Sequence, residues 1–320
     1  MKDKINISNI SDDSGENNTI IKSKRDLTKR RLFLKEKTIG ISISESDELN
    51  QLGFDVAHLN DLAIETARYI LSLGGKLAYG GDMRNGGFTE IIFDLLNYYK
   101  VDSSIHLNER FHSYLAWPIS LTLDKTKQAE LQHSVSFHKI PPPASLNITD
   151  EQSFLSPETK EDFFIWSECL TEMRRTMDFD CAARVFVGGK TKGFKGKCPG
   201  ILEELLIAIE QKRPVYLIGV FGGISLDAIA AIDGNQTERF KKEYYLEGKT
   251  YADFYDYYNK NSENPIDFDS YFNTLKELNW HGLAKLNGLT VEENKRLSVT
   301  PHISEIIFLI IKGLKTIFLK

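Results

Sequence analysis

The sequence predicts an α/β fold in which a doubly wound, mainly parallel sheet carries helical additions toward the C-terminus. Three apolar runs each lead into a pair of glycines, at Gly80-Gly81, Gly188-Gly189 and Gly222-Gly223. Each pair is followed by a stretch with apolar residues at the spacing of an amphipathic helix. Strands that alternate with helices in this way form parallel sheets. The three glycine turns are therefore expected at one edge of the sheet.

The first elements are clear from their patterns. Thr38–Ser44 is the first expected strand. A helix over Val56–Leu73 ends at two glycines, which is typical of a helix C-terminus. Lys76–Gly81 is the second strand with its glycine pair, and Phe88–Tyr99 is the next helix. Two strand-loop-helix units with glycine loops, here and at Ala183–Gln211, indicate a cleft between the loops.

The middle of the chain has a weaker pattern. Ile105–Leu123 is expected to be an extended strand that passes into a loop at a proline. From about residue 125 to 160 no clear period is present and three prolines follow one another, so we expect a loop insertion or lid. Phe163–Met177 is a helix with Arg174 and Arg175 in its last turn, where cations suit the helix dipole.

The second half contains the central strand-loop-helix unit. Val185–Val187 is apolar, a loop rich in Lys and Gly follows, and Pro199-Gly200 opens a strongly periodic helix. Pro214–Val220 is apolar throughout, as expected for an inner parallel strand. Residues 233–320 place tyrosines among charged residues at helical spacing. These rings either pack helices against the sheet or stack on a base. The last helices either pack on the domain or form a homodimer surface.

Length, charge and cysteine content limit the class of protein. The chain has 320 residues, a net charge of -5 and three cysteines without CxxC spacing, so neither a zinc site nor a disulfide framework is indicated. No signal peptide or membrane span is evident, and we expect a cytoplasmic protein. We expect a disordered tail at 1–30, a Rossmann-like domain over 31–232 that includes the insertion at 125–160, and a helical extension over 233–320 packed on it.

Glycine loops at strand ends predict a site for a phosphorylated ligand. Glycine lets the backbone approach a ligand closely, and N–H groups that open a helix favour an anion. Ligands of open parallel sheets bind at the carboxyl ends of the strands where the strand order reverses. The loop lysines bind phosphate or are simply solvated. The expected ligand-binding residues are Ser42, Ser44, Glu45, Gly80, Gly81, Asp82, Arg84, Gly86, Gly87, Thr89, Glu90, Trp117, Gly188, Gly189, Lys190, Gly193, Lys197, Gly200, Gly222 and Gly223. Trp117 is alternatively a core residue.

Two consecutive carboxylates, Glu203 and Glu204, lie in the first turn of the helix after Pro199-Gly200. Cleavage of an N-glycosidic bond passes through a cationic, oxocarbenium-like state at the ribose carbon. One carboxylate can stabilise that state while another activates water. Acids in a first helical turn also complement the helix dipole without any catalysis. Both interpretations stay open.

The order of these parts resembles the SLOG superfamily, relatives of the LOG cytokinin-riboside-phosphate phosphoribohydrolases and of DprA-type DNA-processing domains. The LOG pattern is an Arg-bearing helix, a strand and then PGGxGTxEE, and the corresponding runs here are MRRTM, ARVFVGG and PGILEEL. Gly80–Gly87 is similar to the first LOG glycine loop, and the resemblance covers about residues 38–232. Two departures are present: GGKTKGFKGKCPGI replaces PGGxGT, and the arginine lies one place off the family spacing.

The resemblance implies that Arg174, or its neighbour Arg175, acts with Glu203 and Glu204 as catalytic residues at the ribose and its N-glycosidic bond. It implies a nucleotide or NAD-derived ligand of the ADP-ribose type, in a bacterial antiviral or conflict system, with no metal and no obligatory cofactor. A non-catalytic sensor that signals to a separate effector protein is the alternative. DprA-like DNA binding is weaker, because the net charge is negative. A homo-oligomer is also expected.

Overall fold

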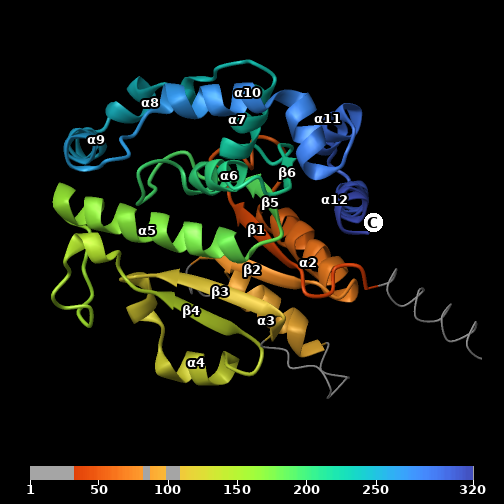
Figure 1. Ribbon diagram of the computed structural model, residues 1–320, viewed down its shortest axis with the longest axis horizontal. Coiled ribbons are helices and arrows are strands. Elements are labelled where there is room, and N and C mark those ends of the chain that lie inside the picture. Colours follow the sequence, from red (N-terminus) through yellow and green to blue (C-terminus); the bar gives the residue numbers. More distant parts are fainter. Residues whose placement is uncertain (1–31, 82–86, 99–108, 320) are drawn as a thin grey trace, which may run out of the picture.

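A computed structural model of the chain describes residues 32–81, 87–98 and 109–319 and contains a six-stranded sheet (Figure 1). The strands are β1 (Thr38–Ser44), β2 (Lys76–Gly80), β3 (Phe111–Ala116), β4 (Ser136–Ile140), β5 (Ala183–Gly188) and β6 (Val215–Ile218). They are hydrogen-bonded in the order β4-β3-β2-β1-β5-β6, and every neighbouring pair is parallel. The expected tail at 1–30 lies outside the described residues.

Helices cover both faces of the sheet, which confirms the predicted doubly wound α/β fold. Those of the sheet domain are α2 (Val56–Ser72), α3 (Phe88–Tyr98), α4 (Lys125–Leu131), α5 (Lys160–Asp180), α6 (Gly200–Glu210) and α7 (Gly223–Ile232). Buried residues of α2 and α3 share one hydrophobic core with the sheet, whereas those of α6 and α7 form a second core and those of α5 a third. No helix among the described residues is long and apolar enough to cross a bilayer.

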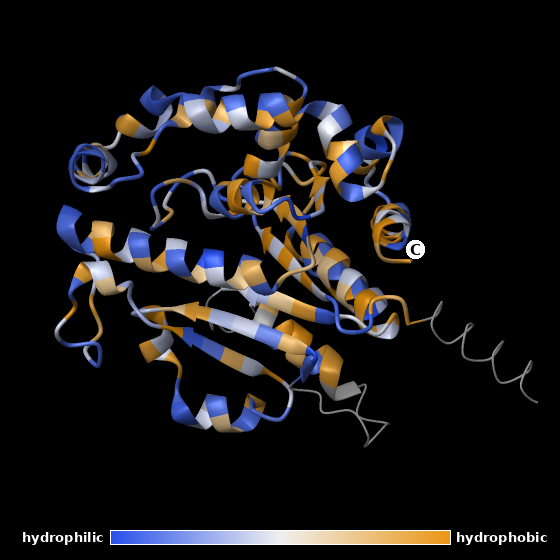
Figure 2. Cartoon of the chain, viewed as in Figure 1, coloured by the Kyte–Doolittle hydropathy of each residue, from blue (hydrophilic) through white to orange (hydrophobic). Residues whose placement is uncertain are grey.

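Alternation along the central strands explains these separate cores. In β5, Val185 and Val187 point into the core beneath α2, while Phe186 joins the core beneath α6 and α7. Ile39 and Ile41 of β1 lie in the first core as well. Figure 2 shows the hydrophobic residues concentrated in the central strands and on the helices against them. This is the pattern expected for a parallel sheet that is buried on both faces.

The C-terminal part is helical and packs on the sheet domain. It consists of α8 (Lys242–Leu246), α9 (Lys249–Asn261), α10 (Phe268–Asn287), α11 (Val291–Val299) and α12 (Ile303–Phe318). Helix α10 contacts α7, α9 contacts α5, α11 contacts β6 and α12 contacts α2. Tyr245, Phe254 and Tyr258 are buried in the same core as α6 and α7. Most of these rings therefore serve packing.

Two expectations for the middle of the chain were wrong. The stretch after residue 125 is not without regular structure, because α4 and the edge strand β4 lie within it. Three of the five residues of β4, Ser136, His138 and Lys139, are polar, as is common for an edge strand, so the sequence did not show an apolar run there. Helix α5 continues to Asp180, so Arg174 and Arg175 do not lie in its last turn, which contains no basic residue.

Candidate functional site

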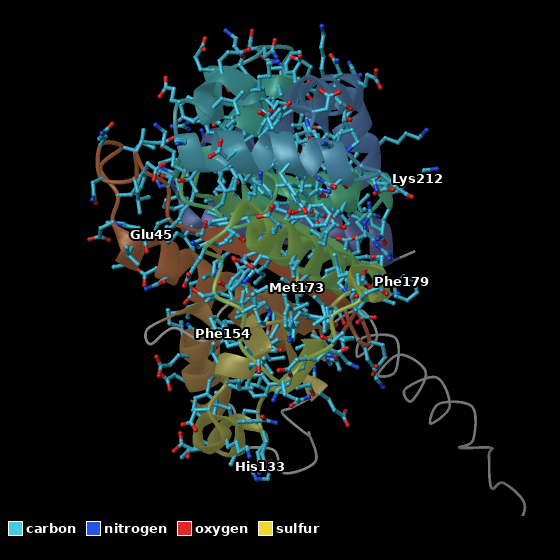
Figure 3. All side chains as sticks on the ribbon, turned by 90° about the vertical axis from the view of Figure 1, so that its left-hand side faces the viewer. Glu45, His133, Phe154, Met173, Phe179 and Lys212 are labelled. Atoms are coloured by element: carbon cyan, nitrogen blue, oxygen red, sulfur yellow. The ribbon has the colours of Figure 1, made fainter. Side chains whose placement is uncertain are left out.

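The sheet reverses its strand order between β1 and β5. From β1 the chain adds β2, β3 and β4 on one side, and α5 then returns the chain so that β5 and β6 lie on the other. Ser44 at the end of β1 is paired with Gly188 at the end of β5. Figure 3 views the molecule from the side toward which β3 points in Figure 1, with the exposed Glu45 labelled just after β1. Ligands of open parallel sheets bind at such a reversal.

The glycine pairs after β5 and β6 let three backbone segments come together. Gly188 has φ 66° and a Cβ there would lie 2.2 Å from the Ser44 carbonyl oxygen. Gly223 has φ 69° and a Cβ there would lie 2.4 Å from the Gly189 carbonyl oxygen. No other residue accommodates both the positive φ and the close approach without strain. Chain packing is thus a sufficient reason for these glycines.

The N-terminus of α7 is already occupied by a carboxylate of the chain itself. Glu48 Oε1 accepts a hydrogen bond from Gly223 N–H at 2.8 Å. Arg239 donates to both oxygens of Glu48, at 2.9 and 3.1 Å, and to Asp227. A phosphate bound at Gly222 and Gly223 would place its negative charge at this helix N-terminus. The Glu48 carboxylate already occupies that position.

The segment between β5 and α6, residues 189–199, is named the Lys-Gly loop here. Thr191 Oγ1 donates to Asp47 Oδ2 at 2.6 Å, which ties the loop to the segment after β1. Tyr251 Oη of α9 donates to the Lys197 carbonyl oxygen at 2.5 Å. Phe194 contacts the Tyr251 ring with centroids 5.4 Å apart. The loop therefore lies between the sheet edge and the C-terminal helices.

Arg174 and Glu203 form a buried ion pair between α5 and α6. Arg174 is 8% exposed and Glu203 3% exposed, and the Arg174 guanidinium donates to Glu203 Oε2. Thr171 donates to the other carboxylate oxygen, and Lys197 Nζ lies 3.6 Å from it. Burial alone would raise the pKa of Glu203, but Arg174, Lys197 and the Thr171 hydrogen bond outweigh it and hold that pKa below the ordinary value. Arg175 is exposed and lies 3.2 Å from Glu210 instead.

Small residues let Arg174 lie directly beneath the Lys-Gly loop. A Cβ on Gly196 would be 3.1 Å from Arg174 Nη1, and a Cβ on Gly200 would be 2.7 Å from Arg174 Nη2. The helix α6 starts at Gly200 without any side-chain cap. The loop backbone thus approaches the guanidinium more closely than a larger side chain would permit.

Glu204 belongs to a second buried cluster that the sequence analysis missed. Its Oε2 accepts from Ser42 Oγ at 2.6 Å and from Arg184, a fully buried cation in β5. Arg184 also donates to Ser42 at 2.7 Å and to Asp178 at 2.9 Å. A charged residue within the apolar run of β5 was the available signal. Arg174 links the two clusters, because its Nε lies 3.7 Å from Glu204 Oε1.

The two carboxylates differ in access. Glu203 borders a cleft of about 780 Å³ between α5, α6 and the C-terminal helices, whereas Glu204 is turned toward β1. Further acidic residues line the same cleft: Glu168, Glu172, Glu210, Glu263 and Asp267. Only two cationic side chains, Arg175 and Lys197, are among its described lining residues. A phosphate is repelled by this balance, whereas a cationic, oxocarbenium-like ribose carbon is favoured.

Other residues named from the sequence lie apart from this pair or outside the described residues. Gly80 and Gly81 end β2, and a Cβ on Gly80 would lie 3.0 Å from Met173 of α5. Asp82, Arg84 and Gly86 lie outside the described residues, as does the side chain of Thr89. Gly87 and Glu90, at the start of α3, are half-buried. Trp117 is 5% exposed and donates from Nε1 to the Glu151 carbonyl oxygen, in a different part of the fold.

The cysteines are buried and free. Burial raises the pKa of Cys169 and Cys181 to about 12 and that of Cys198 further. Thiols with such pKa values are poor nucleophiles and poor metal ligands at neutral pH. Among the described residues, no group of three His, Cys, Asp or Glu side chains could hold a metal ion.

Comparison with known proteins gives one family. A family model described as SLOG cluster2 matches residues 33–297, and no curated protein matches the chain. The matched range begins before β1 and ends within α11. It therefore includes the Lys-Gly loop, both buried ion-pair clusters and the helices α8, α9 and α10.

Proposed function

The chain belongs to the SLOG cluster2 family, and from this premise we propose that it binds a nucleotide or NAD-derived metabolite of the ADP-ribose type at the carboxyl edge of its sheet. The Lys-Gly loop carries the proposal. It leaves β5 where the strand order reverses, and Lys190, Lys192 and Lys195 are exposed on it. Ammonium groups on a glycine-rich backbone suit the phosphates of such a ligand.

A thermal-shift screen tests this proposal. The probes are NAD, ADP-ribose, cyclic ADP-ribose and nucleoside monophosphates, each with wild type and with a Lys190→Glu, Lys192→Glu double variant. We expect at least one probe to raise the melting temperature of wild type and to lose most of that effect in the variant, because two cations become two anions beside the phosphates.

Lys212→Glu is the matched control. Lys212 is exposed and lies between the end of α6 and the start of β6, at the opposite, amino edge of the sheet. It is expected to leave the ligand-induced shift unchanged. Equal shifts in the double variant and in wild type would refute the placement of the ligand, and no shift by any probe would refute nucleotide binding.

Hydrolysis of an N-glycosidic bond is a second candidate function. Its specific support is Glu203, whose ionised carboxylate borders a cleft and is oriented by Arg174 and Thr171. Such a carboxylate can stabilise positive charge on a ribose carbon. Its low pKa makes it a weak base, so we assign it the electrostatic role and leave activation of water to another group.

Chromatography of the incubated mixtures separates binding from turnover. If the protein is a hydrolase, free base and a ribose product appear with wild type and disappear with Glu203→Gln. Glu172→Gln is the matched control, since Glu172 is an exposed carboxylate that lines the same cleft from α5. Unchanged turnover in folded Glu203→Gln protein would refute the assignment, and stabilisation without products favours the non-catalytic sensor.

A sensor in an antiviral or conflict system needs a partner that responds to it. On the basis of family membership, we also propose that the protein self-associates and that it acts on a separate effector protein. Light scattering of the purified protein with and without a stabilising nucleotide tests self-association: we expect the mass of more than one chain. A single-chain mass in both samples would refute it.

A further inference from the structure

A cavity of about 460 Å³ is lined by residues 192–196 of the Lys-Gly loop, and one of these, Gly196, lies close to the Arg174–Glu203 pair. The cavity opens to the surface and is lined by the loop, by the start of α5 and by α8 and α9. Its volume falls within the range of small-molecule sites. Six aromatic rings line it: Phe163, Phe194, Tyr244, Tyr245, Tyr251 and Phe254.

The rings come from three separate segments and contact one another either edge to face or tilted. Phe194 of the loop contacts Tyr245 with centroids 5.6 Å apart and planes at 70°. Tyr244 and Tyr245 are 5.0 Å apart at 84°. Tyr245 and Phe254 are fully part of the buried core, whereas Tyr244, Phe163 and Phe194 are only half-buried. The half-buried rings present apolar surface to the cavity, which suits a flat aromatic guest.

Two lysines of the Lys-Gly loop border the same cavity. Lys192 Nζ lies 4.8 Å from the Tyr244 ring centroid, and Lys195 Nζ lies 5.2 Å from that of Phe163. No carboxylate among the described residues is within ion-pair distance of either ammonium group. Glu247 is the one acidic side chain among the described residues that line the cavity. The two cations are thus available to an anionic guest.

A helix N-terminus adds to this charge. Gly248 precedes α9, and no side chain caps the first N–H groups of the helix. Gly248 and Thr250 both line the cavity. The positive end of the α9 dipole therefore borders the same space as the lysines. The acidic cleft that Glu203 borders has the opposite character.

Gly196 connects the cavity to the buried ion pair. It lines the cavity, and a Cβ on it would meet Arg174 Nη1 at 3.1 Å and Glu203 Oε2 at 3.6 Å. Gly196 therefore lies between residues that line the cavity and the two charged groups of the ion pair. A guest with its aromatic part among the rings would therefore place its other end beside Lys192, Lys195 or Gly196.

We propose that this aromatic cavity receives the base of a nucleotide whose phosphates contact Lys192 and Lys195. The inference rests on the proposed function and deepens it, because it assigns the base to a cavity built in part by α8 and α9. Three features carry it together: the aromatic walls, the two cations without carboxylate partners, and the uncapped start of α9. Stacking on rings accepts any base, so the cavity selects for a base but not for its identity.

The test compares ADP-ribose with ribose 5-phosphate by isothermal titration calorimetry on the full chain. Ribose 5-phosphate has the sugar and a phosphate but no base. In Tyr244→Leu we expect ADP-ribose to bind at least about tenfold more weakly, the loss typical of one stacking ring. Binding of ribose 5-phosphate should be the same in wild type and variant. Tyr244→Phe keeps the ring and should restore wild-type affinity.

Tyr257→Leu is the matched control. Tyr257 is a half-buried tyrosine on α9 that contacts Phe164 and does not line the cavity. Cooperative thermal unfolding of every variant establishes that it is folded. If wild type binds ADP-ribose and Tyr244→Leu binds it equally well, the base lies elsewhere and only this inference fails. If wild type binds none of the nucleotides, the proposed function fails with it.

Discussion

Arg184 is a fully buried cation in the middle of a strand, and Gly40 on the neighbouring strand makes room for it. The two residues are paired across β1 and β5. A Cβ on Gly40 would lie 2.5 Å from the Arg184 side chain and 2.9 Å from Cys181 Sγ. Hydrogen bonds to Asp178, Ser42 and the Glu204 carboxylate compensate the guanidinium for its lost hydration.

Gly40→Ala should therefore destabilise the fold although it adds only a methyl group. We expect the free energy of unfolding in urea to fall by about 1–3 kcal/mol, as for other overpacked cores. Gly282→Ala is the control, since a Cβ in that helix meets only the end of the Leu278 side chain. That control should be neutral or gain up to about 1 kcal/mol from helix propensity. Equal effects of the two substitutions would contradict the close packing around Arg184.

The ion pair of Glu203 makes stability depend on pH. Because the pKa of Glu203 is lower in the folded protein than its ordinary value, the ionised pair stabilises the fold above the ordinary carboxyl range. That stabilisation is lost as pH falls below this range. Glu203→Gln leaves Arg174 without its main partner and should cost about 3–5 kcal/mol at pH 7.

Urea unfolding at pH 7 and pH 4 checks this expectation. The difference between wild type and Glu203→Gln should be large at pH 7 and smaller at pH 4. Glu172→Gln provides the comparison, because Glu172 is exposed on the same helix, α5, as Arg174. A difference that does not change with pH would show that the carboxylate charge is not what stabilises the pair.

The edge strand β4 is held by a pair of histidines across β3 and β4. His112 Nδ1 and His138 Nε2 are 3.0 Å apart, and the His138 ring stacks on Tyr114 with centroids 4.4 Å apart. Burial lowers the pKa of both imidazoles. The charge of His138 and that of Lys76 lower the pKa of His112 further, while Asp180 opposes the shift in both.

Protonation of these histidines at acidic pH should therefore destabilise the pairing of β4 with β3. A folded-state pKa below the ordinary value of 6.5 means that stability is present above that pH and is lost as pH falls through the lowered pKa. We expect the melting temperature of wild type to fall as the pH is lowered from 7.5 to 5.5, and the melting temperature of His138→Gln to fall less over the same range. His133→Gln, at an exposed position between α4 and β4, should keep the wild-type pH dependence. The same dependence in all three proteins would contradict the role of the pair.

Sequence patterns predicted the elements whose apolar residues recur regularly. They failed for elements whose secondary structure depends on tertiary contacts. Thr38–Ser44 was predicted with the bounds that β1 has, because its alternation is strong. In contrast, β4 has only five residues with two polar, titratable side chains, and it is a strand because β3 offers it an edge. A hydrogen bond between residues 162 positions apart, as between Ser42 and Glu204, leaves no local pattern in the sequence.

The candidate site was predicted in part. The first-turn position of Glu203 and the preceding arginine were readable in the chain, and the structure brings Arg174 and Glu203 together. The sequence could not show that the Glu48 carboxylate occupies the start of α7, because Glu48 follows β1 and is 175 residues away from Gly223 in the sequence. Nor could it show which of the many tyrosines pack and which, like Tyr244, border a cavity.

At the scale of the whole molecule, the C-terminal helices complete a cavity that begins at the sheet edge. The chain crosses the sheet once, through α5, and this puts the Lys-Gly loop next to β1. Helices α8 and α9 then cover the outer side of that loop (Figure 1). The family match includes both parts. The division of the chain at residue 232 remains a prediction, and the site that we propose uses both sides of it.

Hydrogen–deuterium exchange with and without saturating ADP-ribose or NAD tests the central claim most directly, because it reports both binding and its location. We predict slower exchange in residues 189–199 and 244–254 when a nucleotide is present. The amino edge around 211–215, on the other side of the sheet, should exchange at the same rate with and without ligand. Unchanged exchange in the Lys-Gly loop, with nucleotides that do bind, would contradict this account.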